Sequence, residues 1–98
     1  MALVIFWTKR ADKKFDKIIA YLEEVWGEAV AKQFVLRVYE LLDLLIKYPE
    51  LGSLQHKQKK IRGFVITKQV SLFYKYDSDR IVILNLFDTR QSIKKKGH

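Results

Sequence analysis

The hydrophobic and polar positions of this chain repeat with one period in its first half and another in its second. Ala2 to Trp7 is an unbroken run of apolar residues, many of them β-branched or aromatic, which is typical of a buried strand. From Lys9 to Tyr48, apolar residues recur every three or four positions, which predicts amphipathic helix. Beyond Lys59 the apolar positions alternate with polar ones or run together, which predicts strands.

Capping residues divide the helical region into two helices. Thr8 offers a hydroxyl that can cap a helix over 9–26, and Gly27 ends that helix because glycine readily adopts the left-handed conformation of a helix exit. A second helix over 28–48 stops before Pro49. Two long helices joined at one glycine predict an antiparallel hairpin. The apolar stripe of the first helix is predicted to be Phe15, Ile18, Ile19, Leu22, Val25 and Trp26.

The alternating region predicts three strands, at residues 59–66, 69–76 and 80–87. The last strand is almost wholly apolar, so we expect it to be central and covered on both faces. The order β-α-α-β-β-β predicts an α+β domain in which a helical hairpin packs on one side of a small, mainly antiparallel sheet. We interpret residues 1–98 as a single domain with a short basic tail over 92–98.

Composition excludes several classes of protein. The 98 residues are 49% hydrophobic and 31% charged, as expected of one globular domain. There is no cysteine, which rules out disulfides, thiolate metal sites and cysteine nucleophiles. The opening apolar run is too short for a membrane span or a signal-peptide core. We therefore expect a cytoplasmic protein that does not act on a membrane.

Motifs for metal, nucleophilic or phosphate-loop chemistry are missing from the sequence. The only histidines are His56 and His98, and no His/Asp/Glu cluster has ligand spacing. No serine is accompanied by an activating base, and the four glycines are scattered. We predict no metal, no cofactor and no small-molecule substrate.

Charge is divided unevenly along the chain. Residues 1–53 carry eight basic and eight acidic residues, whereas residues 54–98 carry eleven basic and three acidic residues, and so hold the whole net charge of +8. Such asymmetry favours an anionic partner. We interpret the neutral half as scaffold and the basic half as the working surface.

The candidate binding residues are cations beside the predicted strands, which adjacent strands can bring into one groove: Lys60, Arg62, Lys68, Lys75 and Arg90. Lys60 and Arg62 are expected on the same strand face as Phe64. Clustered Lys and Arg bind phosphate, and they can stabilise the charge that develops in phosphoryl transfer without a metal. The alternative is that these cations only solvate a small domain, which we favour for the tail lysines. Tyr74 and Tyr76 could stack nucleic-acid bases, but their alternation with buried positions favours the core.

Several short motifs in order resemble one known family, the RelE/ParE superfamily of type II toxin–antitoxin toxins, which includes plasmid-stabilisation proteins. The matching segments are Trp7-Thr8, Tyr21-Leu22, Trp26-Gly27, Pro49-Glu50-Leu51-Gly52, Ile61-Arg62, Leu72-Phe73-Tyr74-Lys75 and Asp88-Thr89-Arg90-Gln91. The resemblance implies the β-α-α-β-β-β fold, a growth-arresting toxin and a cognate antitoxin that neutralises it. ParE-like members inhibit DNA gyrase, whereas RelE-like members cut mRNA on the ribosome as metal-independent endoribonucleases. An inactive or purely nucleic-acid-binding relative is a further alternative.

In the nuclease case, the resemblance assigns catalysis to Lys60, Arg62 and Arg90. Two departures from the nuclease pattern matter. Ser71 stands where active nucleases of the family carry arginine, and no tyrosine or histidine follows Arg90 at the usual catalytic offset. A general acid or base is therefore missing. The long, tightly joined helices also favour the ParE side.

Overall fold

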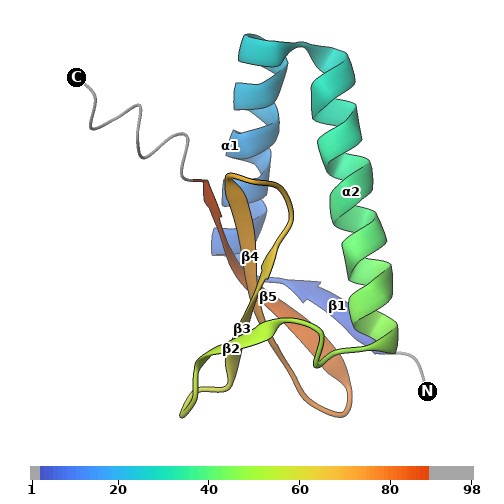
Figure 1. Ribbon diagram of the computed structural model, residues 1–98, viewed down its shortest axis with the longest axis vertical. Coiled ribbons are helices and arrows are strands. Elements are labelled where there is room, and N and C mark those ends of the chain that lie inside the picture. Colours follow the sequence, from blue (N-terminus) through green and yellow to red (C-terminus); the bar gives the residue numbers. More distant parts are fainter. Residues whose placement is uncertain (1–2, 89–98) are drawn as a thin grey trace.

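The structure is a computed structural model that describes residues 3–88 (Figure 1). Its elements are β1 (Val4–Trp7), α1 (Lys9–Trp26), α2 (Glu28–Lys47), β2 (Ser53–His56), β3 (Ile61–Val65), β4 (Val70–Tyr76) and β5 (Arg80–Asp88). The two helices pack as a hairpin on a five-stranded, mostly antiparallel sheet. The predicted α+β fold is thereby confirmed. The predicted tail at 92–98 lies outside the described residues.

The sheet has the order β1-β5-β4-β3-β2, in which β1 runs parallel to β5 and every other pair is antiparallel. The structure adds one strand, β2, to the predicted order. All four residues of β2 are exposed, so its sequence carries no alternation that would have revealed it. β2 also shortens the next predicted strand, because Lys59 and Lys60 form the turn between β2 and β3. Lys60 has φ of 57° in that turn, so the prediction that it shares a strand face with Arg62 was wrong.

β5 is an interior strand between β1 and β4, but it is covered on one face only. Ile81, Ile83 and Leu86 face the helices and are completely buried. Phe87 points to the opposite face and is 43% exposed. The expectation of a doubly covered strand was therefore wrong, because both helices lie on the same side of the sheet.

Two capping residues set the helical hairpin in place. The Thr8 hydroxyl accepts a hydrogen bond from the backbone N–H of Ala11 at 3.1 Å and donates one to the carbonyl of Ile83 at 2.9 Å. This residue therefore begins α1 and also ties that helix to β5. Gly27 has φ of 101°, a conformation that L side chains rarely adopt, and it separates α1 from α2 in a single residue.

The core lies between the helical hairpin and the inner sheet face. Val25 and Trp26, which the sequence pattern placed in the apolar stripe of α1, are 45% and 59% exposed. Figure 1 shows why, because the tip of the hairpin extends beyond the end of the sheet. No helix among residues 3–88 is long and apolar enough to cross a membrane.

Candidate functional site

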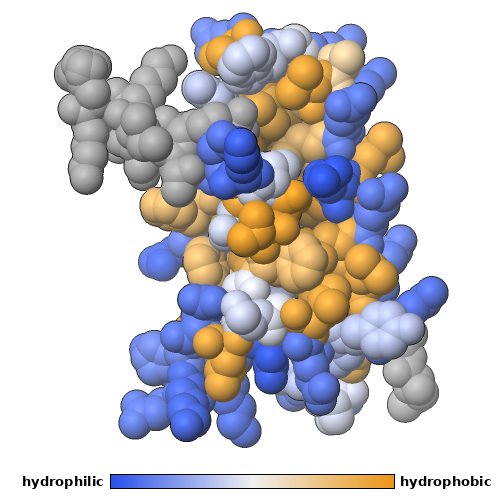
Figure 2. Space-filling view, viewed as in Figure 1, coloured by the Kyte–Doolittle hydropathy of each residue, from blue (hydrophilic) through white to orange (hydrophobic). Residues whose placement is uncertain are grey.

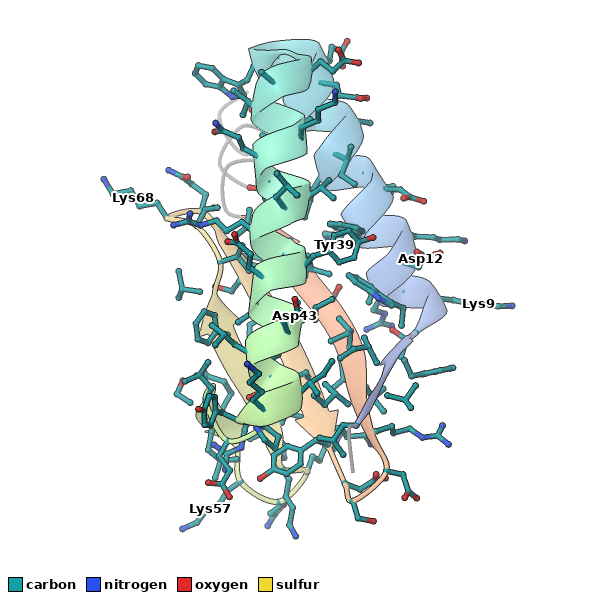
Figure 3. The ribbon with its side chains drawn as sticks, turned by 90° about the vertical axis from the view of Figure 1, so that its right-hand side faces the viewer. Lys9, Asp12, Tyr39, Asp43, Lys57 and Lys68 are labelled. Carbon is teal, nitrogen blue, oxygen red and sulfur yellow. The ribbon has the colours of Figure 1, made fainter. Side chains whose placement is uncertain are left out.

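The predicted binding cations that lie within residues 3–88 do not meet in one groove. Lys60 lies in the turn before β3 and Lys68 in the turn after it, and both are exposed. Figure 3 shows how far apart these turns are, with Lys57 marking one and Lys68 the other. Arg90 lies outside the described residues.

Arg62 and Lys75 occupy opposite faces of the sheet. Arg62 pairs with Tyr74, which is fully buried on the face that packs against the helices. Lys75 is the next residue along β4, and neighbouring strand residues point to opposite faces. The two cations therefore cannot contact one ligand group from the same side.

Arg62 is held by the turn that leads from α2 to β2. Its Nη1 donates hydrogen bonds to the carbonyl oxygens of Gly52 at 2.8 Å and Glu50 at 3.2 Å. Its Cζ also lies 5.9 Å from the centroid of the Tyr76 ring, within the range of a cation–π interaction. The guanidinium thus satisfies backbone carbonyls, which gives this arginine a role in positioning the turn.

Tyr74 holds the same turn from inside the core. Its hydroxyl donates to the carbonyl of Pro49 at 2.7 Å and accepts from the backbone N–H of Gly52 at 2.9 Å. Burial raises the pKa of Tyr74 above its usual value, although the Gly52 N–H and the charge of Arg62 act in the opposite direction. Gly52 itself has no room for a side chain, since an added Cβ would lie 2.8 Å from the carbonyl oxygen of Gly63. Tyr74 and Tyr76 are thus held by the fold, as the alternation of β4 predicted.

The outer face of the sheet, on the side away from the helices, carries a cross-strand row without ionisable groups. Ser71 of β4 pairs with Val65 of β3 on one side and with Phe87 of β5 on the other. Val65 is 64% exposed and Phe87 43% exposed. This row, which we call the Ser71 row, offers apolar contact and one hydroxyl to a partner.

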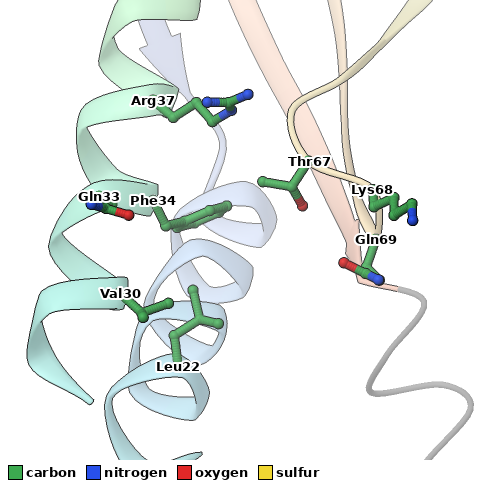
Figure 4. Close-up of a pocket in the computed structure, with 8 residues that line it drawn as sticks. All are labelled: Leu22, Val30, Gln33, Phe34, Arg37, Thr67, Lys68 and Gln69. Carbon is green, nitrogen blue, oxygen red and sulfur yellow. The ribbon is translucent and has the colours of Figure 1, made fainter. Parts of the chain in front are cut away.

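A groove runs between α2 and the segment that follows β3. In its upper part, shown in Figure 4, Val30 and Phe34 face the turn that carries Lys68. Its lower part is lined by Leu41, Leu44, Phe64 and Val65. Arg37 lines both parts, and its Nε donates a hydrogen bond to the carbonyl of Ile66 at 3.0 Å. We call these two neighbouring hollows, which share Arg37, the α2 groove.

The surface seen in Figure 2 is apolar over the centre of the molecule and strongly hydrophilic at the lower left, where Figure 1 places the turn between β2 and β3. Leu44 and Val65 of the α2 groove are both exposed apolar side chains. β3 continues to Val65 past Gly63, the last residue that β2 pairs. The groove could not be predicted from the sequence, because its lining residues come from α2 and β3, which are distant in sequence and become neighbours only in the fold. The available signal was Arg37 among the apolar residues of α2.

Among residues 3–88, no group of three or more His, Asp or Glu side chains is placed to hold a metal ion.

The sequence comparison decides the family. A family profile described as "ParE toxin of type II toxin-antitoxin system, parDE" matches residues 5–93, which is most of the chain. This chain belongs to the ParE toxin family. It is therefore a type II toxin of the ParE/RelE superfamily, and the family implies a cognate antitoxin as partner. No curated protein sequence matches this chain significantly.

Solved structures share the fold of this ParE-family chain. A chain of the structure described as the chromosomal ParDE TA system from P. aeruginosa superposes with a TM-score of 0.72 at 18% identity, over 89% of this chain and 96% of that one. The YoeB dimer from Staphylococcus aureus gives 0.64 at 18% identity, over 89% and 97% of the two chains. A chain described as a YoeB/ParE toxin from Agrobacterium tumefaciens gives 0.64 at 12% identity, over 88% and 98%. At these identities the likeness concerns the fold, and it extends to both ParE and YoeB toxins.

Proposed function

We propose that this ParE-family toxin arrests growth by inhibiting DNA gyrase and is not a ribosome-dependent nuclease. The Ser71 row carries this proposal. Nucleases of the superfamily have an arginine at the position of Ser71, whereas here Val65 and Phe87 flank a serine. Cleavage of RNA needs groups that move a proton and stabilise developing charge, and this row supplies neither.

The position of Arg62 also supports binding over catalysis. Two backbone carbonyls occupy its Nη1, so moving this guanidinium toward a substrate phosphate would leave both carbonyls without that donor. Lys60, in the turn beside β3, and Lys75, on the outer face, do not share a site with it. The three cations are therefore poorly placed to act together on one phosphate.

The outer sheet face is suited to an inhibitor that binds a protein–DNA complex. It exposes Val4, Phe6, Val65 and Phe87. Arg80 lies at the same face, with its Cζ 5.9 Å from the Phe6 ring centroid. Exposed apolar side chains beside cations are typical of a surface that docks on a large anionic partner. Gyrase bound to its DNA is such a partner, and acting on it places the toxin in the cytoplasm.

The cognate antitoxin is proposed to dock in the α2 groove through an acidic, amphipathic segment. Leu44, Phe64 and Val65 offer apolar contact, while Arg37 and Lys68 supply positive charge at the rim. A segment that folds on binding can bury its apolar side chains there and place carboxylates opposite the cations. A toxin held by such an antitoxin can stabilise a plasmid that encodes both proteins.

Charge reversal at two exposed turn lysines tests this docking site. Lys68→Glu places a negative charge at the groove and should weaken antitoxin binding roughly tenfold or more. Lys57→Glu makes the same change at the distant turn and should bind the antitoxin like the unmodified toxin (Figure 3). Isothermal titration calorimetry measures both. Equal losses in the two variants would show that the antitoxin senses net charge and does not occupy the groove.

Induction of the toxin without antitoxin tests the target. A gyrase inhibitor should raise the SOS response while cellular transcripts stay whole. A nuclease should instead cut transcripts at the ribosome, and Lys60→Ala, Arg62→Ala and Arg90→Ala should each abolish that cleavage. Transcript cleavage that depends on these residues would overturn the proposal, and RNA binding would then belong to the function. Unimpaired growth would favour an inactive relative and contradict both toxin mechanisms.

A further inference from the structure

The half of the chain with no net charge carries a concentrated basic surface. Five cations from the first half of α1 line one shallow hollow: Lys9, Arg10, Lys13, Lys14 and Lys17. We call these residues the α1 stripe. Lys14 is partly buried and the other four are exposed, and Figure 3 shows Lys9 extending away from the molecule.

Acidic residues of the same half border the α1 stripe on one flank only. Glu23, Glu24 and Glu28 are at the tip of the hairpin. Asp12 and Asp16 follow Lys9 and Lys13 at a spacing of three residues, so they border the stripe on the flank that holds Ile19. Arg10, Lys14 and Lys17, on the other flank, have no acidic residue three or four positions away on α1.

The α1 stripe works against the stability of its own helix. Cations in the first turns of a helix oppose its dipole, and Asp12 is the only acidic residue in the first turn of α1. Lys9, Lys13 and Lys17 are also spaced four residues apart, which brings like charges together. Among residues 3–88, the structure records no ion pair to any of the five side chains. Fold stability therefore does not account for the stripe, whereas an anionic ligand does.

We propose that the α1 stripe binds the phosphate backbone of duplex DNA. From Lys9 to Lys17 the helix rises about 12 Å, a length over which one strand of a duplex presents about three phosphates. Contacts of lysine with phosphate carry no sequence information, so the binding is electrostatic and independent of base sequence.

Other anionic surfaces fit the α1 stripe less well. Protein interfaces are depleted in lysine and centre on apolar or aromatic anchors, and the hollow is lined by cations alone. A lipid surface would need an apolar flank for insertion, but Ala11, Phe15 and Ile18 are buried in the core. The choice of DNA over RNA rests on the proposed gyrase target, because gyrase acts while bound to duplex DNA.

Binding of the purified full chain to fluorescent nucleic acid tests this inference without gyrase or antitoxin. The probes are a 20-base-pair DNA duplex and a single-stranded RNA of the same length, titrated across a range of salt concentrations. The test variant is Lys13→Gln with Lys17→Gln. The matched control, Lys57→Gln with Lys59→Gln, removes the same charge from the turn between β2 and β3.

Loss of DNA affinity confined to the α1 variant is the expected result. That variant should bind the duplex roughly tenfold more weakly at low salt, and the slope of log affinity against log salt should fall by about two. Lys13→Arg with Lys17→Arg should restore binding. Equal losses in both glutamine variants, no loss in either, or tighter binding of RNA through the same residues would overturn the proposal. Growth arrest in cells is scored separately, so failure of DNA binding and failure of the toxin function are distinguishable.

Discussion

The two halves of this toxin differ in how their basic residues are arranged in space. The sheet half carries the whole net charge, and its basic residues within the described part of the chain lie on both faces and at both ends of the sheet, where Arg62 holds a turn. The helical half has no net charge, yet it gathers five cations on one flank of α1. Net charge summed over a stretch of sequence therefore does not locate a charged surface. In a helix, residues three or four positions apart lie on the same face, so cations can gather on one face while acidic residues lie on another.

A second difference concerns what holds each half in shape. The helical hairpin rests on apolar packing and on caps at Thr8 and Gly27. The sheet half relies in addition on polar contacts, since Arg62 and Tyr74 together bind the backbone from Pro49 to Gly52. Substitutions of polar residues should therefore affect stability in the sheet half and spare it in the α1 stripe.

The largest expected effect comes from comparing two cations of the sheet half. Arg62→Met should lower the free energy of unfolding by about 2–3 kcal/mol, because two turn carbonyls lose a charged donor. Lys75→Met should change it by less than about 0.5 kcal/mol, since Lys75 is exposed. Urea denaturation measures both. Equal stability of the two variants would show that Arg62 is not part of the fold.

Tyr74→Phe should have the next largest effect, a loss of about 2 kcal/mol, because the Gly52 N–H loses its partner inside the core. The pH dependence gives a second readout. Burial raises the pKa of Tyr74, so the neutral phenol is favoured in the folded state. Its contribution is complete below the usual tyrosine pKa of about 10 and is lost as pH rises through the folded value.

Thermal unfolding between pH 8 and 11 separates this contribution from general alkaline denaturation. The unmodified protein should lose more stability over that range than Tyr74→Phe does. The matched variant Tyr39→Phe changes a 52% exposed tyrosine and should keep the full alkaline loss. Parallel curves for all three proteins would contradict the assignment of the loss to Tyr74.

Neutralising the α1 stripe should have a small effect of the opposite sign. Lys13→Gln with Lys17→Gln removes a like-charge pair four residues apart and lessens the conflict with the helix dipole. We expect the free energy of unfolding to rise by about 0.5 kcal/mol in low-salt buffer and the gain to shrink with added salt. A clear loss of stability would mean that these lysines serve the fold, which would remove the reason to assign them to a ligand.

The smallest expected effect is at the turn between β4 and β5. The carboxylate of Asp77 accepts hydrogen bonds from the backbone N–H groups of Asp79 at 2.8 Å and Arg80 at 3.0 Å, and these lower its pKa. Its contribution to stability is present above the usual Asp pKa of about 3.9 and is lost as pH falls through the lower folded value. Asp77→Asn should flatten the acid end of the stability profile slightly. An unchanged profile in circular dichroism would contradict this role.

Much of the fold could be predicted from local signals. The bounds of α1 follow from Thr8 and Gly27, and the alternation of Val70, Leu72 and Tyr74 correctly indicated their burial. β2 was not predicted, because all four residues of this edge strand are exposed and its sequence therefore shows no alternation of apolar and polar residues. Phe87 was expected to be covered, but both helices lie on the other side of the sheet. That arrangement is a tertiary fact that strand composition does not contain.

The candidate surfaces were harder to predict than the fold. Arg62 was predicted to bind the target, and its bonds to Glu50 and Gly52 could not be foreseen because they depend on how the turn after α2 packs against β3. The α2 groove required residues from two elements distant in sequence. The α1 stripe was readable from spacing alone, since Lys9, Lys13 and Lys17 share a helix face, but averaging charge over half the chain concealed it.

Supercoiling of relaxed plasmid by purified DNA gyrase tests the central claim most directly. The full chain, added without antitoxin, should inhibit supercoiling in proportion to its concentration, and the same preparation should leave ribosome-bound mRNA uncut. Adding the cognate antitoxin should restore supercoiling. Unaffected gyrase together with cleavage of ribosome-bound mRNA would contradict the account and assign this toxin to the ribosome.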